Sequence, residues 1–233
     1  MNLFFAKFGL KKEVIHLMIK AVIFDMDGVM IDSEPLWEKT ERILLAKRNI
    51  EYTPVYRDRI VGLNQNDSGR LLIETFELEE EVEDIISERV EILTEIYEEE
   101  LEVVAELIPL LDDLRDANFK LAVASSSPLR VINFVLDMFL LHEYFPIVVS
   151  GECTERGKPH PDIYLHTAKK LEVTSSECVA IEDSINGVKS AKSAGMYCIA
   201  VPDKRLSQTE FQNADLIVSN LKRISPDLIN FFG

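Results

Sequence analysis

Short, almost continuous apolar runs recur along the chain and limit it to a small number of folds. Each run spans only a few residues and is rich in Val, Ile or Ala. Such runs are typical of strands that are buried on both faces, and hence of a parallel sheet. The runs lie at residues 21–24, 120–124, 147–149, 179–181, 197–201 and 216–218.

Helical segments alternate with these runs. They lie at residues 109–117, 128–141, 161–171, 186–194 and 207–213. The alternation predicts a doubly wound, Rossmann-like α/β core with a parallel sheet and right-handed crossovers. Two helix ends carry recognisable signals: Ser127 is a predicted N-cap before Pro128 at the first helical position. Gly195 is a predicted left-handed stop.

One region, residues 34–103, interrupts the alternation because it contains no strand-like run. Helices are expected there at 35–48, 54–60, 66–76 and 79–102. An insert after the carboxyl end of a strand lies above the crevice where open α/β sheets bind ligands, so it can serve as a lid. We therefore expect a core domain of residues 18–33 and 104–233 and a small inserted all-helical cap domain of residues 34–103. Residues 1–17 fit neither part and are expected to be an N-terminal extension, with Met18 as a candidate natural start.

The charge is unevenly distributed, and this restricts the partners. The net charge is −16, and residues 74–102 alone hold 14 acidic residues and a single base, Arg89. We expect this segment to be a solvated helix face. A strongly acidic surface repels nucleic acid, and no apolar run reaches the ~20 residues of a membrane helix. We therefore expect neither nucleic acid nor a membrane as a partner.

The three cysteines, Cys153, Cys178 and Cys198, form no C-x-x-C pair. An odd count without such pairs predicts a reducing, cytoplasmic environment and no disulfide framework. We expect Cys178 and Cys198 to be small core residues because they lie in apolar runs. Nothing in the sequence demands more than a monomer.

Two carboxylates follow the first predicted strand. Asp25 and Asp27 lie directly after the run 21–24 and are followed by Gly28, which allows the chain to turn sharply. A carboxylate at a strand end is held rigidly by the sheet. It can coordinate Mg²⁺ or attack an electrophile, while the second aspartate can transfer protons.

Groups suited to an anion follow the second and third strands. Ser125, Ser126 and Ser127 precede a predicted helix, and hydroxyl and N–H groups at a helix N-terminus can bind an anion. Lys158 lies on a turn stiffened by Pro159 and offers a point charge for a phosphate or a carboxylate. The alternative for Lys158 is an exposed loop lysine.

A second acidic pair, Glu182 and Asp183, ends the fourth strand. Two carboxylate pairs at the same edge of one sheet are typical of a hard-cation site, for which Mg²⁺ is the natural ion. Either Ser184 or Asn186 could cap the helix that follows.

These four motifs, in this order and spacing, resemble the haloacid dehalogenase (HAD) superfamily of phosphotransferases, and the insert resembles the branch with a small helical cap. The resemblance runs from about Ile19 to Val201. The segment 31–37 is similar to that of bacterial hexitol and 2-deoxyglucose-6-phosphate phosphatases.

The resemblance implies a role for each motif residue. Asp25 would be the nucleophile that forms an aspartyl phosphate, and Asp27 would protonate the leaving sugar oxygen and then deprotonate water. Ser125, Ser126 and Lys158 would hold the phosphoryl oxygens.

The resemblance also implies a metal site. Asp25, the backbone carbonyl of Asp27 and Asp183 would bind Mg²⁺, and Glu182 would assist directly or through water. The expected activity is the Mg²⁺-dependent hydrolysis of small sugar or sugar-alcohol phosphates.

The alternative is a β-phosphoglucomutase, because such enzymes share all four motifs. Mutases resemble this chain but carry a histidine where Trp37 lies and an arginine where Gln65 lies, in a cap loop that also contains Gly62 and Asn64. A mutase must hold a second phosphate, so the loss of a cationic clamp favours hydrolysis. A non-enzymatic binding protein would be expected to have lost Asp25 or another motif aspartate.

Trp37, Gly62, Asn64 and Gln65 are therefore the candidate substrate contacts in the cap. Trp37 allows two interpretations. Its ring could pack inside the cap, or it could line the cleft and contact the apolar face of a sugar.

Overall fold

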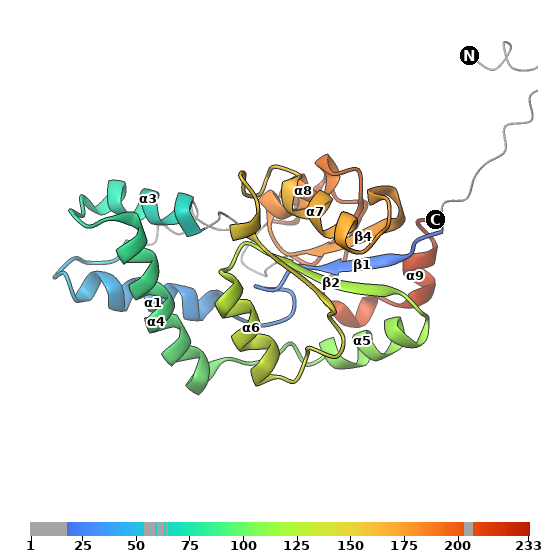
Figure 1. The fold of residues 1–233 in the computed structure, drawn as a ribbon, viewed down its shortest axis with the longest axis horizontal. Helices are drawn as coiled ribbons and strands as arrows, with labels where there is room; N and C mark the ends of the chain where they lie inside the picture. Colours follow the sequence, from blue (N-terminus) through green and yellow to red (C-terminus); the bar gives the residue numbers. More distant parts are fainter. Residues whose placement is uncertain (1–17, 54–58, 60–62, 64, 203–206) are drawn as a thin grey trace, which may run out of the picture.

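A six-stranded parallel sheet forms the centre of the computed structural model, which describes residues 18–53, 59, 63, 65–202 and 207–233 (Figure 1). The strands are β1 (Ala21–Phe24), β2 (Lys120–Ser125), β3 (Ile147–Ser150), β4 (Cys178–Glu182), β5 (Tyr197–Ala200) and β6 (Leu216–Ile217). Their order is β3-β2-β1-β4-β5-β6. The predicted α/β fold is confirmed.

The register of the central strands brings the motif residues together. Phe24 of β1 lies beside Val123 of β2 and Ile181 of β4. The residues that follow these positions therefore leave the sheet at the same carboxyl edge. This is the edge where open α/β sheets bind ligands.

Helices cover both faces of the sheet. On one face lie α7 (Asp162–Lys170) and α8 (Ile185–Ser193), and on the other lie α5 (Leu107–Asp116), α6 (Leu129–Met138) and α9 (Pro226–Asn230) (Figure 1). Alternate residues of β1 point into the two layers, so Val22 and Phe24 join one core cluster and Ala21 and Ile23 join the other. Short 3₁₀ helices connect these elements at Gly151–Cys153, Ser175–Glu177, Gln208–Phe211 and Leu221–Arg223.

Two cysteines belong to this packing. Cys178 and Cys198 are buried in the core cluster on the face of the sheet that α7 and α8 cover, whereas Cys153 is exposed. None of the helices in the described part of the chain is long and apolar enough to cross a membrane.

The insert between β1 and α5 is helical where the structure describes it. It contains α1 (Glu34–Ala46), α3 (Gln65–Phe76) and α4 (Val82–Glu100), which lie to one side of the sheet (Figure 1). The side chains of Ile85, Leu93 and Ile96 are buried on one face of α4. Most of the helix expected at 54–60 lies outside the described residues, and residues 34–103 remain our proposed extent of the cap.

The observed helix ends can be compared with the capping residues that the sequence predicts. Gly195 has a φ of 79°, as expected for a left-handed stop, and Ser184 caps α8 by accepting from the N–H of Gly187 at 3.0 Å. The prediction for Ser127 is wrong: Pro128 itself occupies the N-cap position of α6. The hydroxyl of Ser127 instead donates to a carboxylate oxygen of Asp27 at 2.8 Å, because a tertiary partner replaces the local one.

Candidate active site

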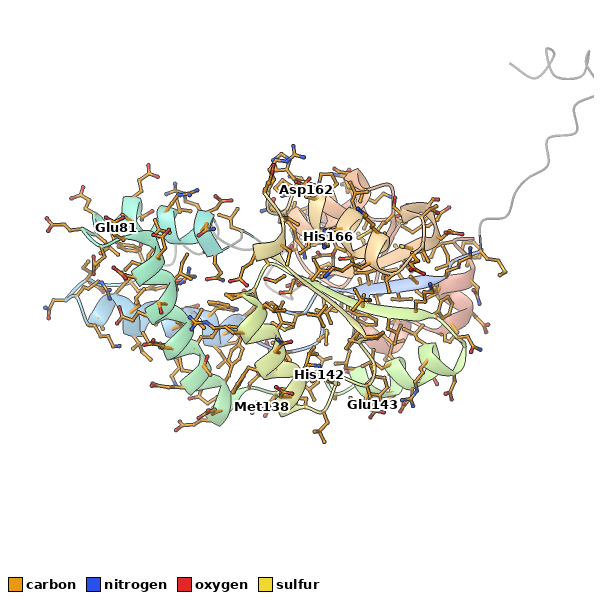
Figure 2. The ribbon with its side chains drawn as sticks, viewed as in Figure 1. Glu81, Met138, His142, Glu143, Asp162 and His166 are labelled. Atoms are coloured by element: carbon orange, nitrogen blue, oxygen red, sulfur yellow. The ribbon has the colours of Figure 1, made fainter. Side chains whose placement is uncertain are left out.

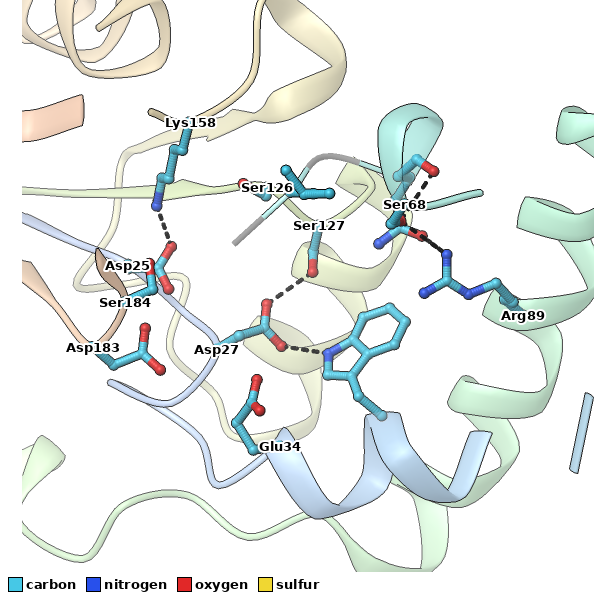
Figure 3. Close-up of a pocket in the computed structure, with 13 residues that line it drawn as sticks. Asp25, Asp27, Glu34, Ser68, Arg89, Ser126, Ser127, Lys158, Asp183 and Ser184 are labelled. Carbon is cyan, nitrogen blue, oxygen red and sulfur yellow. Dashed lines mark hydrogen bonds and ion pairs between the residues drawn. The ribbon is translucent and has the colours of Figure 1, made fainter. Parts of the chain in front are cut away.

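A pocket lies between the carboxyl edge of the sheet and the helical insert (Figure 3). The sheet side contributes Asp25, Asp27, Ser126, Ser127, Lys158, Asp183 and Ser184. The insert contributes Glu34, Trp37, Leu63, Gln65, Ser68 and Arg89. The structure thus brings residues from four separate strand ends to one cavity that the cap borders.

Lys158 is buried at the floor of this pocket, only 3% exposed. Its ammonium donates to Asp25 Oδ1 and to Glu182 Oε1, each at 2.6 Å, and to the carbonyl oxygen of Ala124 at 3.2 Å. The alternative of an exposed loop lysine is therefore wrong. The partners that bury Lys158 lie far away in the sequence, so the residues around Lys158 do not indicate its burial. Burial opposes the charged form of Lys158, but the carboxylates of Asp25 and Glu182 outweigh it and raise the pKa of the lysine.

The pKa of Asp25 is raised, and the charge of Lys158 offsets only part of this shift. Burial is the main cause that raises the pKa of Asp25 to about 8, and the charges of Glu182 and Asp27 add to it while Lys158 opposes it. Burial, together with Asp25 and Glu182, also raises the pKa of Asp183 well above its ordinary range. The site therefore holds more negative charge than its lysine compensates.

Oxygen atoms of Asp25, Glu182 and Asp183 lie within 4.8 Å of one another. A divalent cation that prefers hard oxygen ligands fits this set, because the donors are carboxylates. The positive charge of the cation would also offset the repulsion between the carboxylates. The residues present therefore suit Mg²⁺.

Glu182 differs from the two aspartates in that it does not line the pocket. Its Oε1 accepts from Lys158 and from the hydroxyl of Tyr164, and its side chain is fully buried behind the pocket. The contacts of Glu182 thus fix the position of Lys158.

Gly28 permits the close approach of Asp183. Its φ is 75°, and a Cβ atom at this position would lie 2.0 Å from Asp183 Oδ2. Both the left-handed backbone and the missing side chain are therefore required. The glycine after the two aspartates places the first acidic pair beside the second.

Replacing Gly28 with alanine should destabilise the protein more than the same change at Gly195. Gly195 also has a positive φ, of 79°, but a Cβ there would meet nothing within 4 Å. Gly195→Ala should cost about 1 kcal/mol of backbone strain, and Gly28→Ala should cost that amount and also displace the Asp183 carboxylate. Urea unfolding measures both; equal losses would show that the contact with Asp183 does not matter.

Asp27 joins the sheet side to the insert. Its Oδ1 accepts from Ser33 at 2.7 Å, from the indole N–H of Trp37 at 2.9 Å and from Tyr97 at 3.4 Å. On the other oxygen, Oδ2, the main donor is Ser127 (Figure 3). This carboxylate is thus fixed jointly by the core and by the cap.

Ser125 and Ser126 occupy different positions relative to the pocket. Ser126 lines it, whereas Ser125 is fully buried and accepts from the N–H of Ser127 at 3.0 Å. The hydroxyl of Ser125 also lies 3.4 Å from Asp27 Oδ2.

Trp37 has features of both interpretations offered by the sequence, and its contact with a sugar stays a prediction. It is half-buried and packs against the core cluster, and it also lines the pocket. Its indole N–H donates to Asp27, a role that sequence reasoning did not anticipate. The related cap residue Gln65 lines the pocket too, whereas Gly62 and Asn64 lie outside the described residues.

Arg89 lines the pocket, although the sequence predicts a solvated helix face for its segment. Although it is the single base in the acidic segment 74–102, its side chain is only 2% exposed and forms a buried ion pair with Glu41 at 2.6 Å. Most acidic side chains of the segment are exposed instead, among them Glu81 at the far end of the cap (Figure 2). The only available signal was the isolation of one base among many acids.

Comparison with known proteins identifies relatives over most of the chain. A family model described as "Haloacid dehalogenase-like hydrolase" matches residues 22–201. Hexitol phosphatase B of Escherichia coli (strain K12) is 33% identical over 218 residues, which cover 89% of this chain and 95% of that protein. Phosphorylated carbohydrates phosphatase of Thermotoga maritima is 34% identical over 185 residues, 76% of this chain and 82% of that protein. The crystal structure of β-phosphoglucomutase from Clostridium difficile superposes with a TM-score of 0.82 at 25% identity and covers 92% of this chain and 97% of that one.

Proposed function

Because this chain belongs to the haloacid dehalogenase-like hydrolases, we propose that it hydrolyses phosphate monoesters of small sugars or sugar alcohols and that Asp25 is its nucleophile. The observation that carries the proposal is the buried contact of 2.6 Å between Asp25 and Lys158, beside Asp27, in a pocket that the cap borders. The phosphorylated sugars named for its relatives support the substrate class.

In the first half-reaction, a carboxylate oxygen of Asp25 attacks phosphorus and forms a new P–O bond while the ester P–O bond breaks. Asp27 gives its proton to the departing sugar oxygen. Lys158 favours the ionised form of Asp25 and places positive charge beside the transferring phosphoryl group. Ser126, which lines the pocket, and Ser125, the buried last residue of β2 whose hydroxyl lies beside Asp27, are proposed to hold the phosphoryl oxygens.

In the second half-reaction, water attacks phosphorus, Asp27 takes a proton from it, and the bond between phosphorus and Asp25 breaks. The products are inorganic phosphate and the restored Asp25 carboxylate. The hydrogen bonds from Ser33, Trp37 and Ser127 keep the carboxylate of Asp27 between the core and the cap during both proton transfers.

Mg²⁺ would be held by Asp25, Asp183 and the backbone carbonyl of Asp27, and when bound it supplies positive charge that stabilises the phosphoryl oxygens. Glu182 supports the same site through Lys158. A contribution of Glu182 through a water molecule is consistent with its position behind the pocket.

A phosphate-release screen tests this function. The panel contains hexitol 6-phosphates, hexose 6-phosphates, phosphoglycolate and p-nitrophenyl phosphate, with Asp25→Asn as the control for contaminating phosphatases. β-Glucose 1-phosphate with a glucose 6-phosphate readout tests the mutase alternative. Steady phosphate release from a sugar or sugar-alcohol phosphate supports the proposal, and isomerisation without net release would replace it with the mutase.

Replacing Trp37 with phenylalanine should weaken catalysis by removing one donor to Asp27. The lost hydrogen bond to a charged group should lower kcat on a hexitol phosphate about tenfold. The loss on p-nitrophenyl phosphate should be smaller, because that leaving group needs little protonation. Tyr97→Phe is the matched control: its bond to Asp27 is longer, at 3.4 Å, so its effect should be weaker. Equal losses on both substrates would assign Trp37 to packing instead.

A further inference from the structure

Arg89 lines the end of the pocket away from Lys158 (Figure 3) and forms a buried ion pair with Glu41. Arg89 comes from α4 and Glu41 from α1, and their exposed fractions are 2% and 0%. A buried ion pair contributes little to stability unless its remaining polar atoms are satisfied. Here Arg89 Nε and Glu41 Oε2 are buried without a hydrogen-bond partner among the described residues. Stability alone is therefore a weak explanation for this pair.

The guanidinium group organises two other polar residues of the same wall. Arg89 Nη1 donates to Ser68 Oγ at 3.0 Å and lies 3.4 Å from Gln65 Oε1. This contact orients the side-chain amide of Gln65, so that its oxygen faces Arg89 and its NH₂ group can donate elsewhere. The wall therefore presents fixed hydrogen-bonding groups at the first turn of α3.

Carboxylates offset the positive charge of Arg89 at this wall. Glu41 Oε1 accepts from Arg89 Nη2 at 2.6 Å, and the carboxylate of Glu34 also lines the pocket. The positive charge of Arg89 is thus cancelled at short range. A second anionic group of a substrate would gain little here, whereas neutral hydroxyl groups would find donors and acceptors.

We propose that Arg89 is a specificity-determining residue: with Gln65 and Ser68 it receives the neutral hydroxyl groups of a phosphorylated polyol, and Glu41 cancels its charge so that substrates with a second anionic group are disfavoured. The inference rests on the proposed phosphatase function and deepens it. It identifies the substrate as a monophosphate with a neutral, hydroxylated tail. Bisphosphates and phosphorylated carboxylic acids are the substrates that it places at a disadvantage.

Glu41→Gln tests the role of the charge. The measured quantity is kcat/KM on a hexose 1,6-bisphosphate and on phosphoglycolate, each divided by kcat/KM on a hexitol 6-phosphate. With the charge of Arg89 uncompensated, both ratios should rise about tenfold or more, the effect of one charged contact. Unchanged ratios in a folded variant would overturn the proposal.

The double variant Arg89→Met/Glu41→Leu tests the wall without leaving a buried charge. Its ratio of kcat/KM on hexitol 6-phosphate to that on p-nitrophenyl phosphate should fall about 30-fold, because only the polyol uses the wall. A matched control replaces a more exposed ion pair on α1, the helix of Glu41, in the variant Arg42→Met/Glu38→Leu. Arg42 Nη2 and Glu38 Oε1 lie 2.7 Å apart, but neither residue lines the pocket. Equal losses on both substrates would show a structural role for Arg89.

Different results would contradict the proposed function and the inference about Arg89. If the wild-type protein releases phosphate from no member of the panel, the proposed function is contradicted, and the inference about Arg89 falls with it. If the wild-type protein hydrolyses p-nitrophenyl phosphate but the substrate ratios do not respond to either variant, only the inference about Arg89 is overturned. Should the double variant not fold, the ratios of Glu41→Gln still decide.

Discussion

Asp25→Asn should lower phosphatase turnover by more than about 10⁴-fold, the scale expected when a catalytic nucleophile is removed. The amide that replaces the carboxylate is a poor nucleophile and cannot form the aspartyl phosphate. The loss should be the same on sugar phosphates and on p-nitrophenyl phosphate, because both need the same attack on phosphorus. Steady-state phosphate release measures it.

Asp32→Asn is the matched control for this change. Asp32 lies seven residues further along the chain and is exposed, so the same substitution there should leave turnover close to that of the wild type. Turnover by Asp25→Asn within about tenfold of the wild type would remove the nucleophile from the account. A change in the fold is detected separately by thermal unfolding.

The second large effect concerns the metal. EDTA should abolish turnover, Mg²⁺ should restore it, and Asp183→Asn should lower it by orders of magnitude. Asp183→Asn should also change the free energy of unfolding, in one direction in the metal-free protein and in the opposite direction in the protein with bound Mg²⁺. Without metal at neutral pH, Asp183→Asn should be more stable than the wild type. With saturating Mg²⁺, the wild type should be the more stable of the two.

The sign of this effect follows from the pKa of Asp183. Burial raises that pKa in the folded protein above its ordinary value of 3.8, so the folded state is penalised once pH rises above the ordinary value, and the penalty grows until pH passes the raised pKa. Asparagine has no such penalty. Mg²⁺ at about 100 times its Kd should stabilise the wild type by about 2.7 kcal/mol, which raises Tm by about 5–10 °C for a chain of this size.

Differential scanning calorimetry with EDTA and with Mg²⁺ distinguishes the outcomes. Asp113→Asn, at an exposed position of α5, should follow the wild type in both conditions. If Mg²⁺ raised the Tm of the wild type and of Asp183→Asn equally, the metal would be bound elsewhere.

The strand-end aspartates could be placed from the sequence because their neighbours are apolar and the geometry of a parallel sheet is regular. Once β1 and β4 are adjacent, Asp25 and Asp183 must leave the sheet at the same edge. Gly28 could likewise be assigned to a sharp turn. Its contact with Asp183, however, depends on a strand more than a hundred residues away and leaves no local signal.

Side chains whose partners are distant in sequence could not be assigned in this way. Ser127 before Pro128 satisfies the local rule for an N-cap, yet its hydroxyl bonds to Asp27, 100 residues away. Arg89 follows the same principle, since its surroundings in the sequence are acidic and predict a solvated face. Its partner Glu41 lies on another helix, and burial of the pair is decided only when α1 and α4 pack.

The central claim is that Asp25 itself carries the phosphoryl group, and trapping that group tests it most directly. Asp27→Asn is incubated with p-nitrophenyl phosphate and Mg²⁺, quenched in acid and digested for mass spectrometry. Attack can still occur with this leaving group, while activation of water is impaired, so a phosphorylated peptide should accumulate with the group on Asp25. Asp25→Asn should show none. Phosphate release that proceeds without a phosphorylated peptide, or a phosphoryl group found on another residue, would contradict the account.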